Sequence, residues 1–271
     1  MKGINSMKIF EIYDEENNRS IGVLLYYEKE KSVIIELERD LDEWSAPLLF
    51  TALVKRKIYT IPRDTSLIWV MERVIPSGRQ NIGDILSNHK LKQYDEMKFL
   101  EISEGRCSQD NLCVKKIDSL PDFCLKSQQT NLTEIIPLDD YTMLCFFKNE
   151  KVKKVDLKNL TGEKDFDKVL KFKELYKTAK VGTGGYCVTF NESIDIPAVR
   201  LYKEGKNIPL SSKDFVAFTE KCVLDTTQSC EILGCSRQNI AYMIKQNLLK
   251  PIKENANGNL YLKGEVLQNM W

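Results

Sequence analysis

The sequence contains a single histidine, His89, among 271 residues. Metal sites built from several histidines and acid–base mechanisms that use two of them are therefore excluded. The cysteines show no Cys-x-x-Cys spacing, which is typical of zinc sites and dithiol redox motifs, so we expect no metal and no cofactor. We expect them instead to be reduced, mostly buried thiols. They are Cys107, Cys113, Cys124, Cys145, Cys187, Cys222, Cys230 and Cys235.

Long hydrophobic runs are also missing. The longest, such as Val23–Tyr27 and Met143–Phe147, are far shorter than the roughly 20 apolar residues that cross a bilayer. The first twenty residues lack an apolar segment followed by small residues, which a signal peptide would have. We therefore expect a cytoplasmic protein with no membrane contact.

Neither sign of charge is in excess, because 40 Lys and Arg residues face 39 Asp and Glu residues, for a net charge of +1. This balance excludes nucleic-acid binding by an entirely basic surface, but it does not exclude a small DNA-binding module. The length suits two or three small domains better than one large core. We predict an α+β fold made of three modules.

The first module, residues 1–117, is predicted to be a small α+β unit. Apolar runs at 21–27 and 32–37 predict two strands joined by a charged turn. A helix is expected over 94–103 and a further strand over 112–117. The cluster of Trp44, Leu48, Leu49 and Leu53 predicts a short helix or a packed loop. In the helix over 94–103, Met97, Leu100 and Ile102 are expected to face the core.

The second module, residues 132–210, is predicted to be a small hairpin-and-helix unit, preceded by a linker loop over 119–130. A hairpin is expected from strands 142–147 and 151–157, with an amphipathic helix over 164–177. The Gly-Thr-Gly-Gly sequence at 182–185 lacks the spacing of a phosphate-binding loop and predicts a turn entering a strand. Eleven lysines face six acids over 148–180, which indicates either a solvated face or an auxiliary DNA contact.

The third module, residues 211–271, has the most specific pattern. Asp225 and Gln228 have the spacing of a capping box, which predicts a helix that ends at Gly234. Ser236 is then expected to cap a second helix over 237–246. Short strands at 249–253 and 259–262 are expected around Asn257-Gly258, with a last helix over 265–270. Two helices, a tight turn and a β-wing are typical of a DNA-binding module.

The second of these helices has the composition of a recognition helix. Its inward residues are expected to be Ile240, Met243 and Ile244. On the other face, Arg side chains can contact guanine and Gln or Asn side chains adenine, whereas Tyr and Lys suit phosphates. The predicted DNA-contacting residues are Thr227, Ser236, Arg237, Gln238, Asn239, Tyr242, Lys245, Lys253 and Asn257. Because residues 222–271 carry five bases against four acids, one copy attracts DNA weakly and we expect a homodimer. The alternative is that this polar face is only solvated.

Residues 226–267 resemble the winged helix-turn-helix of the excisionase and MerR families. The residues in register with the family pattern Glu-Ala-Ala-x-x-Leu-Gly-Val-Ser-Arg are Gln228, Ser229, Cys230, Leu233, Gly234, Cys235, Ser236 and Arg237. Gln, Ser and Cys replace the usual Glu-Ala-Ala, which are changes conservative in size. The resemblance implies binding to double-stranded DNA through the second helix.

The two front modules resemble parts of other bacterial proteins. Residues 134–202 are similar, at 146–160 and 186–196, to a small family of unknown function that often precedes a helix-turn-helix. Ile21-Gly22 and the segments 74–86 and 94–110 resemble the N-terminal subdomain of HipA-type toxin kinases. Residues 118–271 supply neither the ATP-gripping loop nor the catalytic Asp of that kinase body. Because related systems carry this subdomain as a separate protein that neutralises the kinase, the resemblance implies protein–protein contact.

Three function classes are compatible with the sequence. The first is a DNA-binding transcriptional regulator, in which the front modules mediate dimerisation or sense a partner or signal. The second is a non-catalytic interaction protein of the antitoxin or mobile-element kind, which binds a protein partner through residues 1–117 and autoregulates its operon. The third is an enzyme with Cys107 or Cys187 as nucleophile. Since neither cysteine has a base nearby in sequence, we expect no enzymatic activity.

Overall fold

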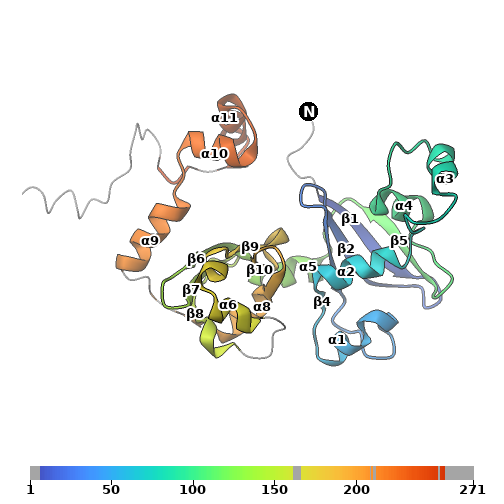
Figure 1. Cartoon of the computed structure of the whole chain (residues 1–271), viewed down its shortest axis with the longest axis horizontal. Coiled ribbons are helices and arrows are strands. Elements are labelled where there is room, and N and C mark those ends of the chain that lie inside the picture. Colours follow the sequence, from blue (N-terminus) through green and yellow to red (C-terminus); the bar gives the residue numbers. More distant parts are fainter. Residues whose placement is uncertain (1–6, 161–165, 208, 210–211, 250, 254–271) are drawn as a thin grey trace, which may run out of the picture. The chain divides into compact units, whose positions relative to one another are not determined.

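The computed structural model describes residues 7–160, 166–207, 209, 212–249 and 251–253 (Figure 1). The chain forms two compact units, residues 1–209 and 210–271. All strand pairs of the described residues are antiparallel. The prediction of a mixed α+β fold is confirmed. No helix among the described residues is long and apolar enough to span a bilayer.

A five-stranded sheet in the order β4-β3-β2-β1-β5 dominates the first part of unit 1. The strands expected at 21–27, 32–37 and 112–117 are confirmed. The strands are β1 (Met7–Asp14), β2 (Arg19–Tyr27), β3 (Ser32–Leu37), β4 (Thr60–Ile61) and β5 (Leu112–Ile117). The helices of this part are α1 (Thr51–Lys55), α2 (Arg63–Met71), α3 (Ile82–Asn88) and α4 (Glu96–Ser103).

One face of this sheet packs against α2 and α4, where Trp69, Val70, Met97 and Leu100 join a single apolar core. Asp95 begins α4 by accepting a hydrogen bond from the Lys98 amide at 3.1 Å. The helix expected over 94–103 is therefore confirmed, with Met97 and Leu100 facing inward as predicted.

Ile102, which was predicted to face the core, is exposed, and so are Trp44 and Leu48. Ile102 is 45% exposed, because it lies two residues, or about 200°, around the helix from Leu100. Trp44 and Leu48 are 88% and 93% exposed. Trp44 lies in a turn over 42–47, which Asp42 stabilises by accepting hydrogen bonds from the amides of Trp44 and Ser45. Leu48 begins the 3₁₀ turn Leu48–Phe50 that follows.

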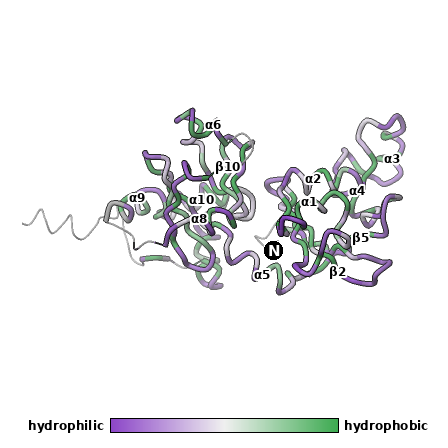
Figure 2. Tube along the Cα trace, turned by 90° about the horizontal axis from the view of Figure 1, so that it is seen from below, coloured by the Kyte–Doolittle hydropathy of each residue, from purple (hydrophilic) through white to green (hydrophobic). Residues whose placement is uncertain are grey.

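The central strand β2 is buried on both faces. Because side chains alternate along a strand, Leu24 faces the α2 side and Val23 and Leu25 face the opposite side. On that second side the sheet packs against Cys124 and Tyr186. Figure 2 shows hydrophobic stretches along the sheet and hydrophilic stretches at its hairpin turns.

The segment 119–130, predicted to be a linker loop, is largely helical, so this prediction is wrong. It forms α5 (Asp122–Ser127), which Pro121 precedes, and then a 3₁₀ turn over Gln128–Thr130. Cys124 in α5 has no exposed surface. The helix forms because it covers the apolar second face of the sheet, a contact that its polar composition does not indicate.

A buried polar cluster accompanies this contact. Glu36 in β3 is 1% exposed, and its Oε2 accepts hydrogen bonds from Ser127 Oγ at 2.9 Å and Thr60 Oγ1 at 3.2 Å. Tyr186 Oη accepts from Gln128 Nε2 at 3.0 Å. Burial raises the pKa of the Glu36 carboxyl, and the hydrogen bond from Ser127 offsets this in part. The carboxyl therefore holds its proton more tightly than an exposed glutamate does.

The rest of unit 1 contains two further sheets around one core. A four-stranded sheet has the order β12-β8-β7-β6, and a three-stranded sheet the order β11-β10-β9. The hairpin expected from 142–147 and 151–157 is confirmed. The strands are β6 (Leu132–Pro137), β7 (Thr142–Phe147), β8 (Val152–Asp156), β9 (Lys180–Val181), β10 (Cys187–Phe190), β11 (Ile194–Pro197) and β12 (Lys206–Asn207). The helices are α6 (Phe166–Lys171), α7 (Lys173–Lys177) and α8 (Ala198–Glu204).

Two helices, α6 and α7, replace the single helix expected over 164–177. The prediction of one continuous helix is therefore wrong. Phe172 between them has extended backbone angles, φ −117° and ψ 102°. Its side chain is 61% exposed, whereas Phe166 and Tyr176 are buried in the core. Breaking the helix lets both ends face the core. Residues 164 and 165 lie outside the described part of the chain.

The glycine sequence at 182–185 forms the predicted turn before β10. Gly184 and Gly185 have φ of +60° and +77°, in the left-handed region that favours glycine. A Cβ on Gly184 would collide with Tyr27 Oη, and one on Gly185 with the Leu132 carbonyl oxygen. These glycines are therefore required by the conformation and by the close approach of neighbouring segments.

Candidate nucleic-acid interface

The described part of unit 2 consists of three helices: α9 (Ser212–Cys222), α10 (Thr226–Leu233) and α11 (Arg237–Lys245). The two helices predicted from the capping signals are both present. The helix α9 was not predicted, although the apolar spacing of Phe215, Phe218 and Cys222 is typical of a helix.

The capping box that begins α10 forms as predicted. Asp225 Oδ1 accepts from the Gln228 amide at 2.8 Å, and Gln228 Oε1 accepts from the Asp225 amide at 3.0 Å. These two bonds satisfy amides that have no partner inside the helix. The first turn of α10, including the exposed Thr227, therefore has a fixed backbone.

The turn between α10 and α11 is also built as the sequence predicts. Gly234 has φ of +60° and ψ of 38°, a left-handed conformation that ends a helix. The Cys235 amide donates to the Cys230 carbonyl at 3.1 Å, and Cys235 is half-buried. Ser236 then caps α11, because its Oγ accepts from the Asn239 amide at 3.3 Å.

The two faces of α11 differ in composition. Ile240 and Met243 are buried, at 5% and 7% exposure, as predicted. Ile244 is 39% exposed, so its predicted inward position is wrong. The buried stripe runs through positions 240 and 243 and leaves position 244 at its edge.

The exposed face of α11 contains most of the residues predicted to contact DNA. Arg237, Gln238 and Lys245 are exposed and Asn239 is half-buried, while Tyr242 is 42% exposed. Since α11 contains Arg237 and Lys245 but no Asp or Glu, the helix itself carries two positive charges.

The beginnings of the two helices lie next to each other. Arg237 Nη2 donates to Thr227 Oγ1 at 3.0 Å. One hydrogen bond uses one of the five N–H donors of a guanidinium and leaves the others for further partners. Thr227, Ser236 and Arg237 therefore lie at one end of the helix pair, and Tyr242 and Lys245 lie farther along α11.

The predicted β-wing is the least supported part of the module. Lys253 is exposed, but Leu249 and residues 251–253 form no strand, so the strand predicted over 249–253 is wrong for these residues. Asn257, the second wing strand at 259–262 and the helix predicted at 265–270 lie outside the described residues.

The described residues show free cysteines and no cluster of metal-binding side chains. All eight cysteines are free thiols; Cys113, Cys124 and Cys145 are buried and the other five are half-buried. In the part of the chain that the structure describes, no group of three or more His, Cys, Asp or Glu side chains could hold a metal ion. Burial raises the pKa of Cys187 to about 12, so this thiol is protonated at neutral pH.

Comparison of the whole chain with models of protein families, with curated proteins and with solved structures gave no match of any of the three kinds.

Proposed function

We propose that this protein binds double-stranded DNA through α11 and acts as a transcriptional regulator. The observation that carries the proposal is the helix pair α10–α11: two capped helices joined at a left-handed Gly234, with a second helix that is polar, basic and free of acids on its exposed side. A helix of this kind fits the major groove, where its first residues meet base edges.

The residues of α11 divide by role. Gln238 and Asn239 have amide side chains that can donate to and accept from adenine, and Arg237 can donate to guanine. Thr227, Ser236, Tyr242 and Lys245 suit phosphate oxygens, which fix the register of the protein but do not read sequence. Lys253, beyond α11, adds a phosphate contact.

The weak net charge of residues 222–271 favours a homodimer on DNA. One module with few cations makes few phosphate contacts and binds weakly. Two copies would read half-sites about 10 base pairs, or a multiple of that, apart on one face of the duplex.

A gel-shift assay on the DNA upstream of the chain's own gene tests the proposal. We expect a sequence-specific shift that competitor DNA of unrelated sequence does not abolish, and a weaker shift with Arg237→Ala or Gln238→Ala. A parent protein that shifts both DNAs equally, or not at all, would refute sequence-specific binding by this module.

A second role, binding of a protein partner by the front of the chain, is favoured by the exposed apolar side chains of Trp44 and Leu48. Coexpression with the products of neighbouring genes, followed by co-purification on the full chain, tests this role. The full chain is the right bait, because Val23 and Leu25 pack against Cys124 and Tyr186. A fragment ending at residue 117 would expose that apolar face and bind partners nonspecifically.

We propose that neither role involves catalysis. Nucleophilic catalysis by a cysteine needs the thiolate, and burial keeps the Cys187 thiol protonated. Incubation with labelled ATP and magnesium, with autophosphorylation and ATP turnover as readouts, tests this part of the proposal.

A further inference from the structure

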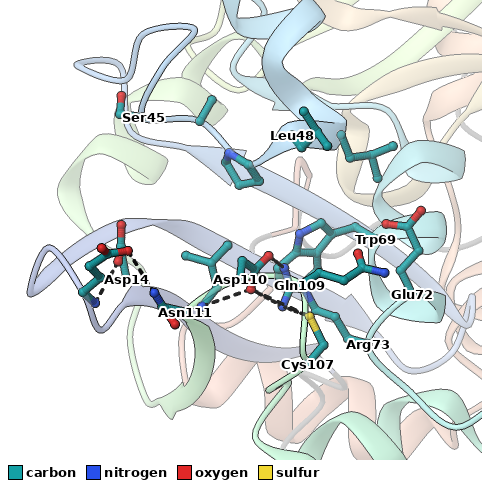
Figure 3. Close-up of a pocket in the computed structure, with 15 residues that line it drawn as sticks. Asp14, Ser45, Leu48, Trp69, Glu72, Arg73, Cys107, Gln109, Asp110 and Asn111 are labelled. Atoms are coloured by element: carbon teal, nitrogen blue, oxygen red, sulfur yellow. Dashed lines mark hydrogen bonds and ion pairs between the residues drawn. The ribbon is translucent and has the colours of Figure 1, made fainter.

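Unit 1 contains a cavity of about 740 Å³ beside the five-stranded sheet (Figure 3). Four segments that are distant in sequence line it: the end of β1, the segment 45–49, the end of α2 and the loop that precedes β5. Its volume lies within the roughly 300–1,000 Å³ that is usual for ligand pockets.

The lining of this cavity is acidic. Asp14, Glu16, Glu72 and Asp110 supply four carboxylates, and Arg73 is the one cation among the lining residues. Arg73 donates to both carboxylate oxygens of Asp110. Burial acts to raise the pKa of Asp110, but the hydrogen bonds from Arg73 and the Leu112 amide, together with the charge of Arg73, outweigh it and the pKa lies below its usual value. One ion pair therefore leaves three carboxylates without a cation inside the cavity.

Two buried N–H groups of the lining point to a ligand that carries an acceptor. Trp69 is 2% exposed and Arg73 7% exposed, and the guanidinium carbon of Arg73 lies 4.0 Å from the centre of the Trp69 ring. Trp69 Nε1 and Arg73 Nε have no hydrogen-bond partner among the described residues. Figure 3 shows the indole in the middle of the lining residues, beside Arg73. Because a buried N–H without an acceptor is unfavourable, an incoming carbonyl would satisfy it.

The rim of the cavity is apolar. Leu48 lines it and is 93% exposed, and Trp44, just before the lining segment, is 88% exposed. Large exposed apolar side chains next to a pocket are typical of surfaces that bind a protein.

We propose that this cavity binds a short basic peptide segment of a protein partner. A main-chain carbonyl of the peptide accepts from Trp69 Nε1, Lys or Arg side chains lie near Glu16 and Glu72, and an apolar residue packs against Leu48. A polyamine would match the charge but brings no acceptor, and the carboxylates repel nucleic acid. The inference rests on the partner-binding role proposed for the front of the chain and is independent of DNA binding.

The test is calorimetric titration of the full chain with an acetylated and amidated peptide, Gly-Arg-Leu-Lys-Gly-Gly. The comparison ligands are the same peptide with Glu in place of Arg and Lys, and spermine. The variants are Glu16→Gln, Glu72→Gln and Trp69→Phe, which keeps an aromatic ring and removes the N–H. Glu30→Gln, in the exposed turn after β2, is the matched control.

We expect saturable one-to-one binding of the basic peptide and none of the acidic one. Glu16→Gln and Glu72→Gln should each weaken binding about two- to fivefold, as for partly exposed ion pairs. Trp69→Phe should weaken it about three- to tenfold through the lost hydrogen bond, and Glu30→Gln should leave it unchanged.

Failure to bind the basic peptide, or equal binding of the acidic one, overturns the inference. So does spermine binding as tightly as the peptide, because charge alone would then explain the affinity. Since the two Gln variants change exposed side chains, they remain informative even if Trp69→Phe fails to fold. A peptide that binds all variants equally overturns the cavity assignment and leaves the partner role to the co-purification experiment.

Discussion

Replacing Glu36 by Gln should stabilise the protein at alkaline pH and have little effect in acid. Glu36 is 1% exposed, and its pKa is raised by burial, with hydrogen bonds from Ser127 and Thr60 opposing the shift. A carboxyl whose pKa is raised in the folded state stabilises folding when it is protonated. That stabilisation is complete below the pKa of the unfolded chain and is lost as the pH rises through the folded-state pKa.

The size of the effect follows from the environment of the side chain. Glu36 Oε2 accepts two hydrogen bonds, and Oε1 has no partner among the described residues. Gln is nearly isosteric with protonated Glu and keeps an acceptor for Ser127. The parent and the Glu36→Gln variant should therefore be equally stable at pH 4. At pH 8, Gln avoids burying a charge, and we expect it to be more stable by about 1–3 kcal/mol.

Urea unfolding of the full chain at pH 4, 6 and 8, followed by far-ultraviolet circular dichroism, measures this difference. Glu30→Gln changes an exposed side chain in the turn between β2 and β3. The stability difference between this variant and the parent should not change with pH. The reasoning would be refuted if Glu36→Gln were less stable than the parent by the same amount at every pH. An equal deficit at every pH would mean that the pKa of Glu36 is the same in the folded and unfolded states, so that burial does not raise it.

Three further outcomes follow from the backbone and the assembly. Gly185→Ala should destabilise unit 1 by at least about 2 kcal/mol, because a left-handed alanine costs about 1–2 kcal/mol and its Cβ would also collide with the Leu132 carbonyl. Gly83→Ala, a helical position with open space around it, should be neutral or stabilising in the same urea assay. Asp225→Ala and Ser236→Ala should each cost about 1 kcal/mol in thermal unfolding of the helix pair, whereas Asp225→Asn should cost less because it keeps a capping acceptor. Light scattering at micromolar concentration should detect a dimer on DNA, and a monomer both free and bound would contradict the proposed assembly.

The features that the sequence predicted well are set by residues close together in the chain. The capping box at Asp225 and Gln228, the Gly234 turn and the Ser236 cap each depend on contacts within a few residues. The glycine turn before β10 was predicted for the same reason. Local backbone preferences suffice at such positions because no distant segment has to be known.

The features that the sequence did not predict depend on tertiary contacts. The segment that contains Cys124 is helical because it covers the second face of the sheet, and its polar neighbours hide that role. Trp44 is apolar but exposed. A hydrophobic pattern in the sequence does not distinguish such a residue from one in the core. The cavity around Trp69 and Arg73 unites four distant segments. Trp69 and Arg73 have the four-residue spacing at which side chains meet on a helix, but α2 ends at Met71 and Arg73 lies in the turn that follows.

The most direct test of the central claim is an equilibrium anisotropy titration of the parent, Gln238→Ala and Gln246→Ala on a labelled duplex from the chain's own upstream DNA. Gln246 has the same chemistry as Gln238 but follows the opposite end of α11 and is likewise exposed. If α11 reads base edges with its first turn, Gln238→Ala weakens specific binding by about 1–3 kcal/mol, or roughly five- to 150-fold, and Gln246→Ala leaves it unchanged. Equal affinities for all three proteins would contradict recognition of DNA by this helix.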